Sequence, residues 1–173
     1  GPLDPVIERA PCDVALVEFE QETIGESVAL VDAGPHAATV AQRAVDFATV
    51  DGETATLLTV QRSTDDADPV KEGRRMIEWV ATQANLDPDE YEPKIVVSEN
   101  LSSAIIDAVT GYDTVCVGLS ERSDAERLEF GSTARRVSRD APGNVAVVRG
   151  QELLNPDDRD RALADVTAAE DLT

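Results

Sequence analysis

Short apolar runs rich in Val, Ile and Leu alternate along the chain with longer segments in which apolar residues recur every three or four positions. The short runs are typical of strands buried in a parallel sheet, and the longer segments are typical of amphipathic helices. The pattern predicts strands at 27–32, 54–60, 94–98, 113–118 and 144–148, with helices at about 35–50, 69–85, 101–109 and 131–140 between them. We therefore expect an α/β fold with an open, doubly wound, five-stranded parallel sheet and helices on both faces.

Two of the predicted helices begin at a proline, which gives up only an amide that would lack a partner at the first helical position. Gly34-Pro35 opens one and Asp68-Pro69 opens the other. Met76 and Trp79 are interpreted as packing residues at the border of the second helix. The expected inner faces are Ala37, Val40, Ala41, Ala44, Val45 and Ala48 in the first helix, and Val70, Ile77, Val80, Ala81 and Ala84 in the second.

An internal repeat links the two ends of the chain. Residues 6–17 align without gaps on 137–148, and six of the twelve positions are identical. The alignment predicts that residues 1–20 are the last helix and strand of a preceding copy of the same domain, although chance similarity between two such units is the alternative. The expected organisation is this tail, a linker at 21–26, the domain at 27–150 and an acidic tail at 151–173.

The charge balance narrows the function classes. The chain has 173 residues, with 35 acidic against 15 basic side chains, a net charge of -20 and a pI near 4.2. This excess of carboxylate argues against nucleic-acid and anionic membrane partners. The carboxylates are dispersed, and only two of the basic residues are lysines, Lys71 and Lys94. We expect a protein kept in solution in molar salt, as in a halophile; an ordinary acidic mesophile protein is the alternative.

The few residues with reactive or metal-binding side chains favour neither a metal site nor secretion. Cys12 and Cys116 each lie in an apolar run, which predicts buried thiols in a reducing, cytoplasmic compartment. His36 is the only histidine, so a site that needs two imidazoles is excluded. No apolar run approaches the length of a membrane span, and we expect no membrane insertion of this piece.

Candidate binding residues gather where the predicted strands end. Asp32, Val60 and Gly118 close the first, second and fourth strands, and Gly131-Ser132-Thr133 opens the last helix. Ligands of doubly wound sheets bind at the carboxyl ends of the strands, and a glycine before a helix start suits a phosphate group. Gly131-Ser132 alone would also serve as a plain helix cap.

The spacing of Gly118 and Gly131-Ser132 resembles the universal stress protein family, whose nucleotide-binding members carry Gly, two residues, Gly, nine residues, Gly and then Ser or Thr. Asp32 and the ending at 141–148 also match, so the resemblance covers about residues 26–150. It implies a sheet of order 3-2-1-4-5 and dimerisation through the last strand, so that 13–17 could lie antiparallel beside 144–148. It also implies an adenine nucleotide, ATP or AMP, over the first and fourth strands. The cofactor-binding residues carried over are Asp32, Ala33, Gly34, Val60, Gly118, Gly131, Ser132 and Thr133.

The sequence departs from this motif at its second glycine, which is replaced by Glu121. At about 5 Å and an effective dielectric near 20, a carboxylate opposes a phosphate charge by about 3 kcal/mol, although molar salt screens an exposed loop. Arg122 and Arg127 in the same loop could offset the repulsion, or could serve as surface ion-pair partners.

Two function classes follow. The first is a regulatory domain that senses an adenine nucleotide in a stress response, with no catalysis. It would work beside another copy of the domain, as an appendage of a larger protein such as a membrane transporter, for example an amino-acid permease. The second is an interaction or dimerisation module without nucleotide. The chain has no Gly-x4-Gly-Lys-Ser/Thr run, no Gly-x-Gly-x-x-Gly after its first strand and no nucleophile spaced with a base, so we expect no enzyme. The expected location is the cytoplasm, including the cytosolic face of a membrane.

Overall fold

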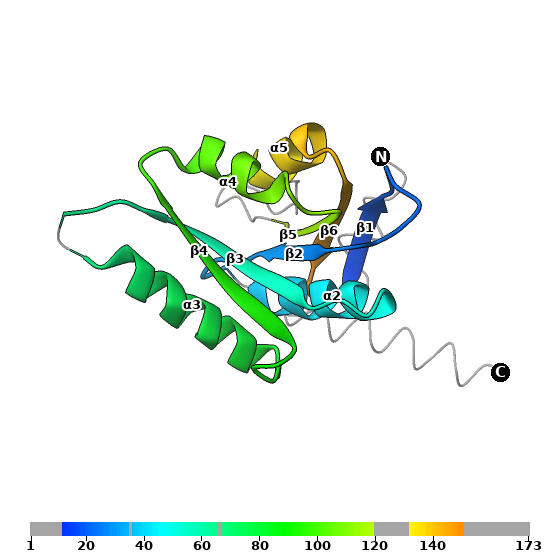
Figure 1. The fold of residues 1–173 in the computed structure, drawn as a ribbon, viewed down its shortest axis with the longest axis horizontal. Helices are drawn as coiled ribbons and strands as arrows, with labels where there is room; N and C mark the ends of the chain where they lie inside the picture. The colour runs from blue at the N-terminus through cyan, green and yellow to red at the C-terminus, as the bar shows by residue number, and fades with distance from the viewer. Residues whose placement is uncertain (1–11, 35, 66, 120–131, 151–173) are drawn as a thin grey trace, which may run out of the picture.

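The structure of the chain is a computed structural model, which describes residues 12–34, 36–65, 67–119 and 132–150. Within these ranges the chain forms six strands and four helices (Figure 1). In chain order they are β1 (Val14–Glu18), β2 (Ser27–Leu30), α2 (Ala37–Val50), β3 (Ala55–Arg62), α3 (Pro69–Gln83), β4 (Tyr91–Ser98), α4 (Leu101–Val109), β5 (Thr114–Gly118), α5 (Ser132–Asp140) and β6 (Asn144–Arg149). Each strand and helix predicted from residue 27 onward is present, with ends that differ by a few residues.

All six strands belong to one sheet, in the order β1-β6-β5-β2-β3-β4. Counted from β2 along the chain, the five parallel strands stand in the order 3-2-1-4-5. The α/β class is confirmed. β1 joins the five parallel strands antiparallel to β6, in the position expected for 13–17, so the complete sheet is six-stranded and mixed. Helices α2 and α3 pack on one face and α4 and α5 on the other, as Figure 1 shows.

The N-terminal strand occupies the sheet edge that the sequence assigned to it. β1 pairs with β6 from Val14 opposite Arg149 to Glu18 opposite Val145. Arg149 is fully buried, and its Nη2 donates a 2.9 Å hydrogen bond to the Cys12 carbonyl oxygen just before β1. The expectation that Cys12 is buried is wrong, because its run forms the outermost strand. Cys116, in the central strand β5, is buried as expected, and its burial raises the pKa of the thiol to about 12.

The small-residue face of α2 is confirmed, since five of its six expected positions are buried against the sheet and Val45 packs partly buried beside them. In α3, Ile77, Val80, Ala81 and Ala84 are buried as predicted. Two expectations for α3 are wrong: Val70 is 45% exposed and Trp79 is 52% exposed. Val70 lies in the first turn, before the helix reaches the core. Trp79 lies about 200° around the helix from Ile77, which places it on the solvent face.

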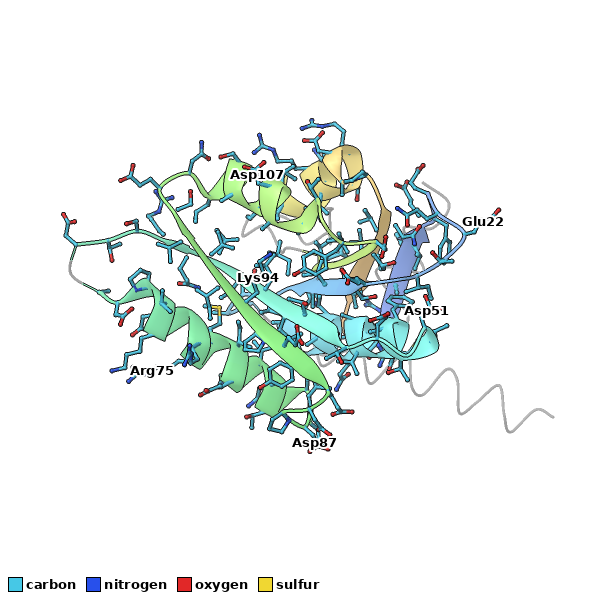
Figure 2. The ribbon with its side chains drawn as sticks, in the orientation of Figure 1. Glu22, Asp51, Arg75, Asp87, Lys94 and Asp107 are labelled. Atoms are coloured by element: carbon cyan, nitrogen blue, oxygen red, sulfur yellow. The ribbon has the colours of Figure 1, made fainter. Side chains whose placement is uncertain are left out.

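The acidic side chains are spread over the molecule, as the sequence indicates. Figure 2 shows Glu22, Asp51, Asp87 and Asp107 on four separate segments of the chain. The ion pairs found in the described ranges, such as Arg43 with Asp46 at 3.2 Å, join exposed or half-exposed side chains. Pairs of this kind contribute little to stability. In the described part of the chain, no helix is long and apolar enough to cross a membrane.

Candidate functional site

A cavity of about 550 Å³ opens at the carboxyl ends of β2, β3 and β5. This is the point where the chain turns from β2 toward β3 on one side, while β5 lies on the other. Crevices at such a switch point hold the ligands of doubly wound sheets, and the volume falls within the range of small-molecule sites. The walls come from the ends of these strands, the start of α2, and side chains of α3, α4 and α5.

Asp32 and Gly34 line the cavity where the chain passes from β2 to α2. The Asp32 Oδ1 atom accepts a 2.7 Å hydrogen bond from the Gly34 N–H, which fixes the turn. A Cβ atom on Gly34 would lie 2.7 Å from the same oxygen, so a larger residue there would displace the Asp32 carboxylate from this hydrogen bond. Val60, two residues before the end of β3, also lines the cavity. Ala33 is exposed and stands outside the lining set.

The two sides of the predicted phosphate loop are also at the cavity. Gly118 at the end of β5 and Thr133 in the first turn of α5 both line it. A Cβ atom on Gly118 would lie 3.1 Å from the His36 Cβ and 3.4 Å from a Val40 methyl carbon, so close packing against α2 already favours glycine there. Ser132 begins α5. Gly131 and Glu121, on which the phosphate-loop expectation depends, lie outside the described residues.

His36 is the functional candidate that the sequence reasoning missed. It is the N-cap residue of α2, only 3% exposed, and it lines the cavity. Its Nδ1 atom accepts a 2.9 Å hydrogen bond from the backbone N–H of Gly150, so in the neutral ring the proton is on Nε2. Nε2 is buried and has no hydrogen-bond partner among the described residues. A buried donor left in this state costs about 1–3 kcal/mol.

The environment of His36 keeps its ring uncharged. Burial and the nearby positive charge of Arg149 lower the pKa of His36 from 6.5 to about 4, and the negative charge of Asp13 opposes this shift in part. Near neutral pH the imidazole is therefore a neutral hydrogen-bond donor at a cavity wall. Asp32 and Arg62 are the charged residues among those that line the cavity in the described ranges, and both are exposed.

The remaining polar lining comes from the last residues of β3, which continues two residues beyond its predicted end at Val60. The Gln61 Nε2 atom donates a 2.9 Å hydrogen bond to the Thr59 hydroxyl, and the Thr59 hydroxyl lies 3.5 Å from the Met76 sulfur. Arg62 extends this row to the cavity mouth. A longer strand was not predicted because its last two residues are polar. The available signal for Gln61 and Arg62 as lining residues was their position directly after a buried strand, where ligands of such sheets bind.

The described lining of the cavity offers several hydrogen-bonding groups. In the described ranges, no cluster of three or more His, Cys, Asp or Glu side chains could hold a metal ion. The one buried thiol, Cys116, is held protonated by burial and is absent from the lining. Backbone turns, one neutral imidazole, hydroxyls and an amide provide hydrogen bonds to a small polar ligand.

Comparison with known proteins gives a consistent assignment. The model of the universal stress protein family matches residues 28–149. No curated protein sequence matches this chain. The universal stress protein from Archaeoglobus fulgidus is 19% identical, with a TM-score of 0.59 over 72% of this chain and 98% of that one. Its structure in complex with dAMP gives 18% identity, a TM-score of 0.56 and the same coverage.

A third similar structure is longer than the described fold. The putative universal stress protein from Pseudomonas aeruginosa UCBPP-PA14 is 14% identical, with a TM-score of 0.60. The similarity covers 91% of this chain but only 59% of that one. At these identities the three structures establish a shared fold.

Proposed function

The chain belongs to the universal stress protein family, and from that premise we propose that its domain is a regulatory sensor that binds an adenine nucleotide, ATP or AMP, without catalysing a reaction. The observation that supports this proposal most strongly is the cavity at the carboxyl ends of β2, β3 and β5, with Asp32, Val60, Gly118 and Thr133 at its walls. The complex of a relative with dAMP adds support, since that protein shares the fold.

In this proposal the nucleoside lies against the β2 and β3 side of the cavity, and the phosphates lie toward β5 and α5. Asp32, Ala33, Gly34 and Val60 form the first part of the site. Gly118, Gly131, Ser132 and Thr133 form the second. Calorimetric titration of ATP, ADP and AMP in molar KCl tests the proposal. Saturable binding with one site per chain supports it, and no binding of any of the three contradicts it.

A second candidate function is an interaction module without nucleotide, in which the Glu121 carboxylate closes the phosphate loop. The pairing of β1 with β6 favours it. Leu16 lies opposite Val147, and these two residues are also equivalent in the internal repeat. When equivalent residues are exchanged, the pair formed by Ala15 and Val148 converts into the pair formed by Val17 and Ala146. The two outermost pairs interchange in the same way when the alignment is extended by one residue, to Glu18 and Arg149. The two strands are thus related by a local two-fold axis at the pair formed by Leu16 and Val147.

That symmetry also supports our proposal for the domain organisation. Residues 1–20 would be the end of a preceding copy, 21–26 a connector, 27–150 the complete domain and 151–173 an acidic tail. A preceding copy would meet this one across the edge where β1 now lies. The Pseudomonas relative, of which this fold covers only part, has room for such a second copy.

The wider setting is proposed from the charge and the family. The dispersed carboxylates and scarce lysines favour a halophilic source, and the proposed location is the cytoplasm. The parent protein would be a tandem stress protein or a membrane transporter, such as an amino-acid permease, with this domain at its cytosolic face. Fractionation of cells that express the complete gene product distinguishes these two parents. A tandem stress protein should be recovered in the supernatant, and a transporter should be recovered in the membrane fraction.

A further inference from the structure

His36 has features that the proposed nucleotide site does not yet explain. Its ring is almost completely buried, its Nδ1 atom accepts the hydrogen bond from Gly150, and its Nε2 atom has no partner among the described residues. A buried donor without a partner is rare in folded proteins, and each case calls for an explanation. The position of His36 at the cavity wall suggests that the partner is a ligand atom.

The ring connects the end of β6 to the cavity. Gly150, which holds Nδ1, is buried and does not line the cavity, whereas His36 does. The two ring nitrogens point in nearly opposite directions, so Nε2 points away from Gly150. The Cβ and Cγ atoms of His36 lie 3.1 Å and 3.8 Å from the place that a Cβ atom on Gly118 would take. The imidazole therefore lies beside the β5 end of the cavity, on the side proposed for phosphate.

Two electrostatic features favour an anionic partner there. α2 begins at this wall with no acidic residue in its first turn and no capping hydrogen bond from its N-cap side chain. The positive end of its helix dipole is therefore available to an anion. The buried guanidinium of Arg149 lies close enough to His36 to affect its ionisation and adds positive potential, which the negative charge of Asp13 offsets in part.

We infer that His36 is a ligand-binding residue whose Nε2–H donates a hydrogen bond to a phosphate oxygen of the bound nucleotide, at the N-terminus of α2. This inference rests on the proposed function and names a contact for the same ligand. It gives the phosphate a side-chain donor that is independent of the loop in which Glu121 replaces glycine.

Two substitutions separate the ligand contact from the structural role of the ring. In His36→Asn the amide oxygen can take the place of Nδ1 and keep the Gly150 N–H satisfied, but no donor reaches the Nε2 position. In His36→Gln the longer side chain can place an NH2 group near the Nε2 position, but the acceptor for Gly150 is lost. If Nε2 contacts the ligand, the His36→Gln variant should bind the nucleotide more tightly than the His36→Asn variant. If the ring has a purely structural role, the order of the two affinities should be reversed.

The experiment is a calorimetric titration of the wild-type chain and both variants with AMP, ATP and adenosine in molar KCl. We expect His36→Asn to lower the affinity for AMP and ATP about tenfold or more. His36→Gln should lower it less than about threefold. Adenosine, which has no phosphate, should bind all three proteins with similar affinity. Equal AMP affinity of His36→Asn and wild type, or an equal loss for adenosine, would overturn the inference.

A spectroscopic measurement on the wild-type chain avoids any folding defect of the variants. Because His36 is the only histidine, its ring nitrogens give the only imidazole signals in a ¹⁵N spectrum. AMP should shift the Nε2 resonance, keep the proton on Nε2 and raise the pKa of His36, whereas adenosine should do so much less. Binding of AMP without any change at Nε2 would overturn this inference and leave the proposed function standing. Failure of the wild type to bind any nucleotide would overturn both.

Discussion

The side-chain amide of Asn144, at the start of β6, donates a 3.1 Å hydrogen bond to the hydroxyl of Thr114, at the start of β5, and both residues are buried. The same amide nitrogen donates to the Thr23 carbonyl oxygen, and its amide oxygen accepts from the backbone N–H groups of Glu20 and Gln21. The Thr114 hydroxyl in turn donates to the Ile24 carbonyl oxygen. Two side chains thus hold the connector between β1 and β2.

Replacing Asn144 by Ala should therefore destabilise the domain strongly. The change leaves two backbone donors and one carbonyl without their partner, so we expect a loss of about 3 kcal/mol in the free energy of unfolding. Asn100→Ala is the matched control, because Asn100 is an exposed cap that accepts one hydrogen bond from Ser103 and should cost about 1 kcal/mol. Denaturant unfolding measures both values. A cost for Asn144→Ala no larger than that of the control contradicts this account of the connector.

The connector illustrates what the sequence could and could not predict. The alternation of apolar runs and helical periods was sufficient for the sheet and its covering helices, because burial on both faces of parallel strands leaves a strong pattern. The segment at 21–26 reads as a plain linker in the sequence. Its hydrogen bonds to Asn144 and Thr114 join residues more than 80 positions apart, and such pairings leave no local signal.

The absence of a local signal for long-range contacts also explains which cavity residues the sequence predicted and which it missed. Asp32, Gly34, Val60, Gly118 and Thr133 all line it because strand ends converge at a switch point, which topology predicts. His36 was missed because its importance comes from a hydrogen bond to Gly150 and from burial. Neither can be read from neighbouring residues. Trp79 and Val70 show the opposite error, because both are apolar and yet exposed.

The ionisation of His36 should make the stability of the domain depend on pH. The pKa of His36 is lowered from 6.5 to about 4 by burial and by Arg149, while Asp13 partly opposes the shift. As pH falls below 6.5 the unfolded chain takes up the proton first, so this contribution to stability is complete above pH 6.5 and is lost between pH 6.5 and about 4. We expect about 2 kcal/mol after allowance for solvent screening, measured as the difference between wild type and His36→Gln.

Arg149→Met provides an independent check of the cause. Removing the positive charge should move the pKa of His36 back toward 6.5, because Arg149 is the second contributor to the downward shift after burial. The single histidine makes the titration directly observable by NMR. A titration midpoint that stays near 4 in this variant would mean that burial alone sets the pKa.

Restoring glycine at Glu121 should tighten ATP binding. The substitution removes one carboxylate and one side chain from the loop that joins β5 to α5, and at moderate screening the gain should be about tenfold in affinity. Glu126→Gly, which removes a carboxylate from the same loop outside the motif, is the control and should change affinity by less than about threefold. An unchanged ATP affinity in the Glu121 variant would mean that the loop does not reach the phosphates.

The dispersed acidic coat should make folding depend on salt. With a net charge of -20 and mostly exposed ion pairs, repulsion between carboxylates disfavours the compact state, and salt screens it. The melting temperature should rise by several degrees between 0.1 and 2 M KCl at pH 7, and less at pH 4, where many carboxylates are protonated. A rise of the same size at both pH values would point to a general salting-out effect instead of charge screening.

The cavity at the carboxyl ends of β2, β3 and β5 should bind an adenine nucleotide, and equilibrium dialysis with labelled AMP and ATP in 2 M KCl tests this binding most directly. Wild-type chain and the control Asp107→Ala, which changes an exposed residue of α4 outside the cavity, should bind one nucleotide per chain with equal affinity. Asp32→Ala should bind about tenfold more weakly, because its turn and its carboxylate are lost from the wall. No saturable binding by the wild type, or equal binding by Asp32→Ala, would contradict the claim.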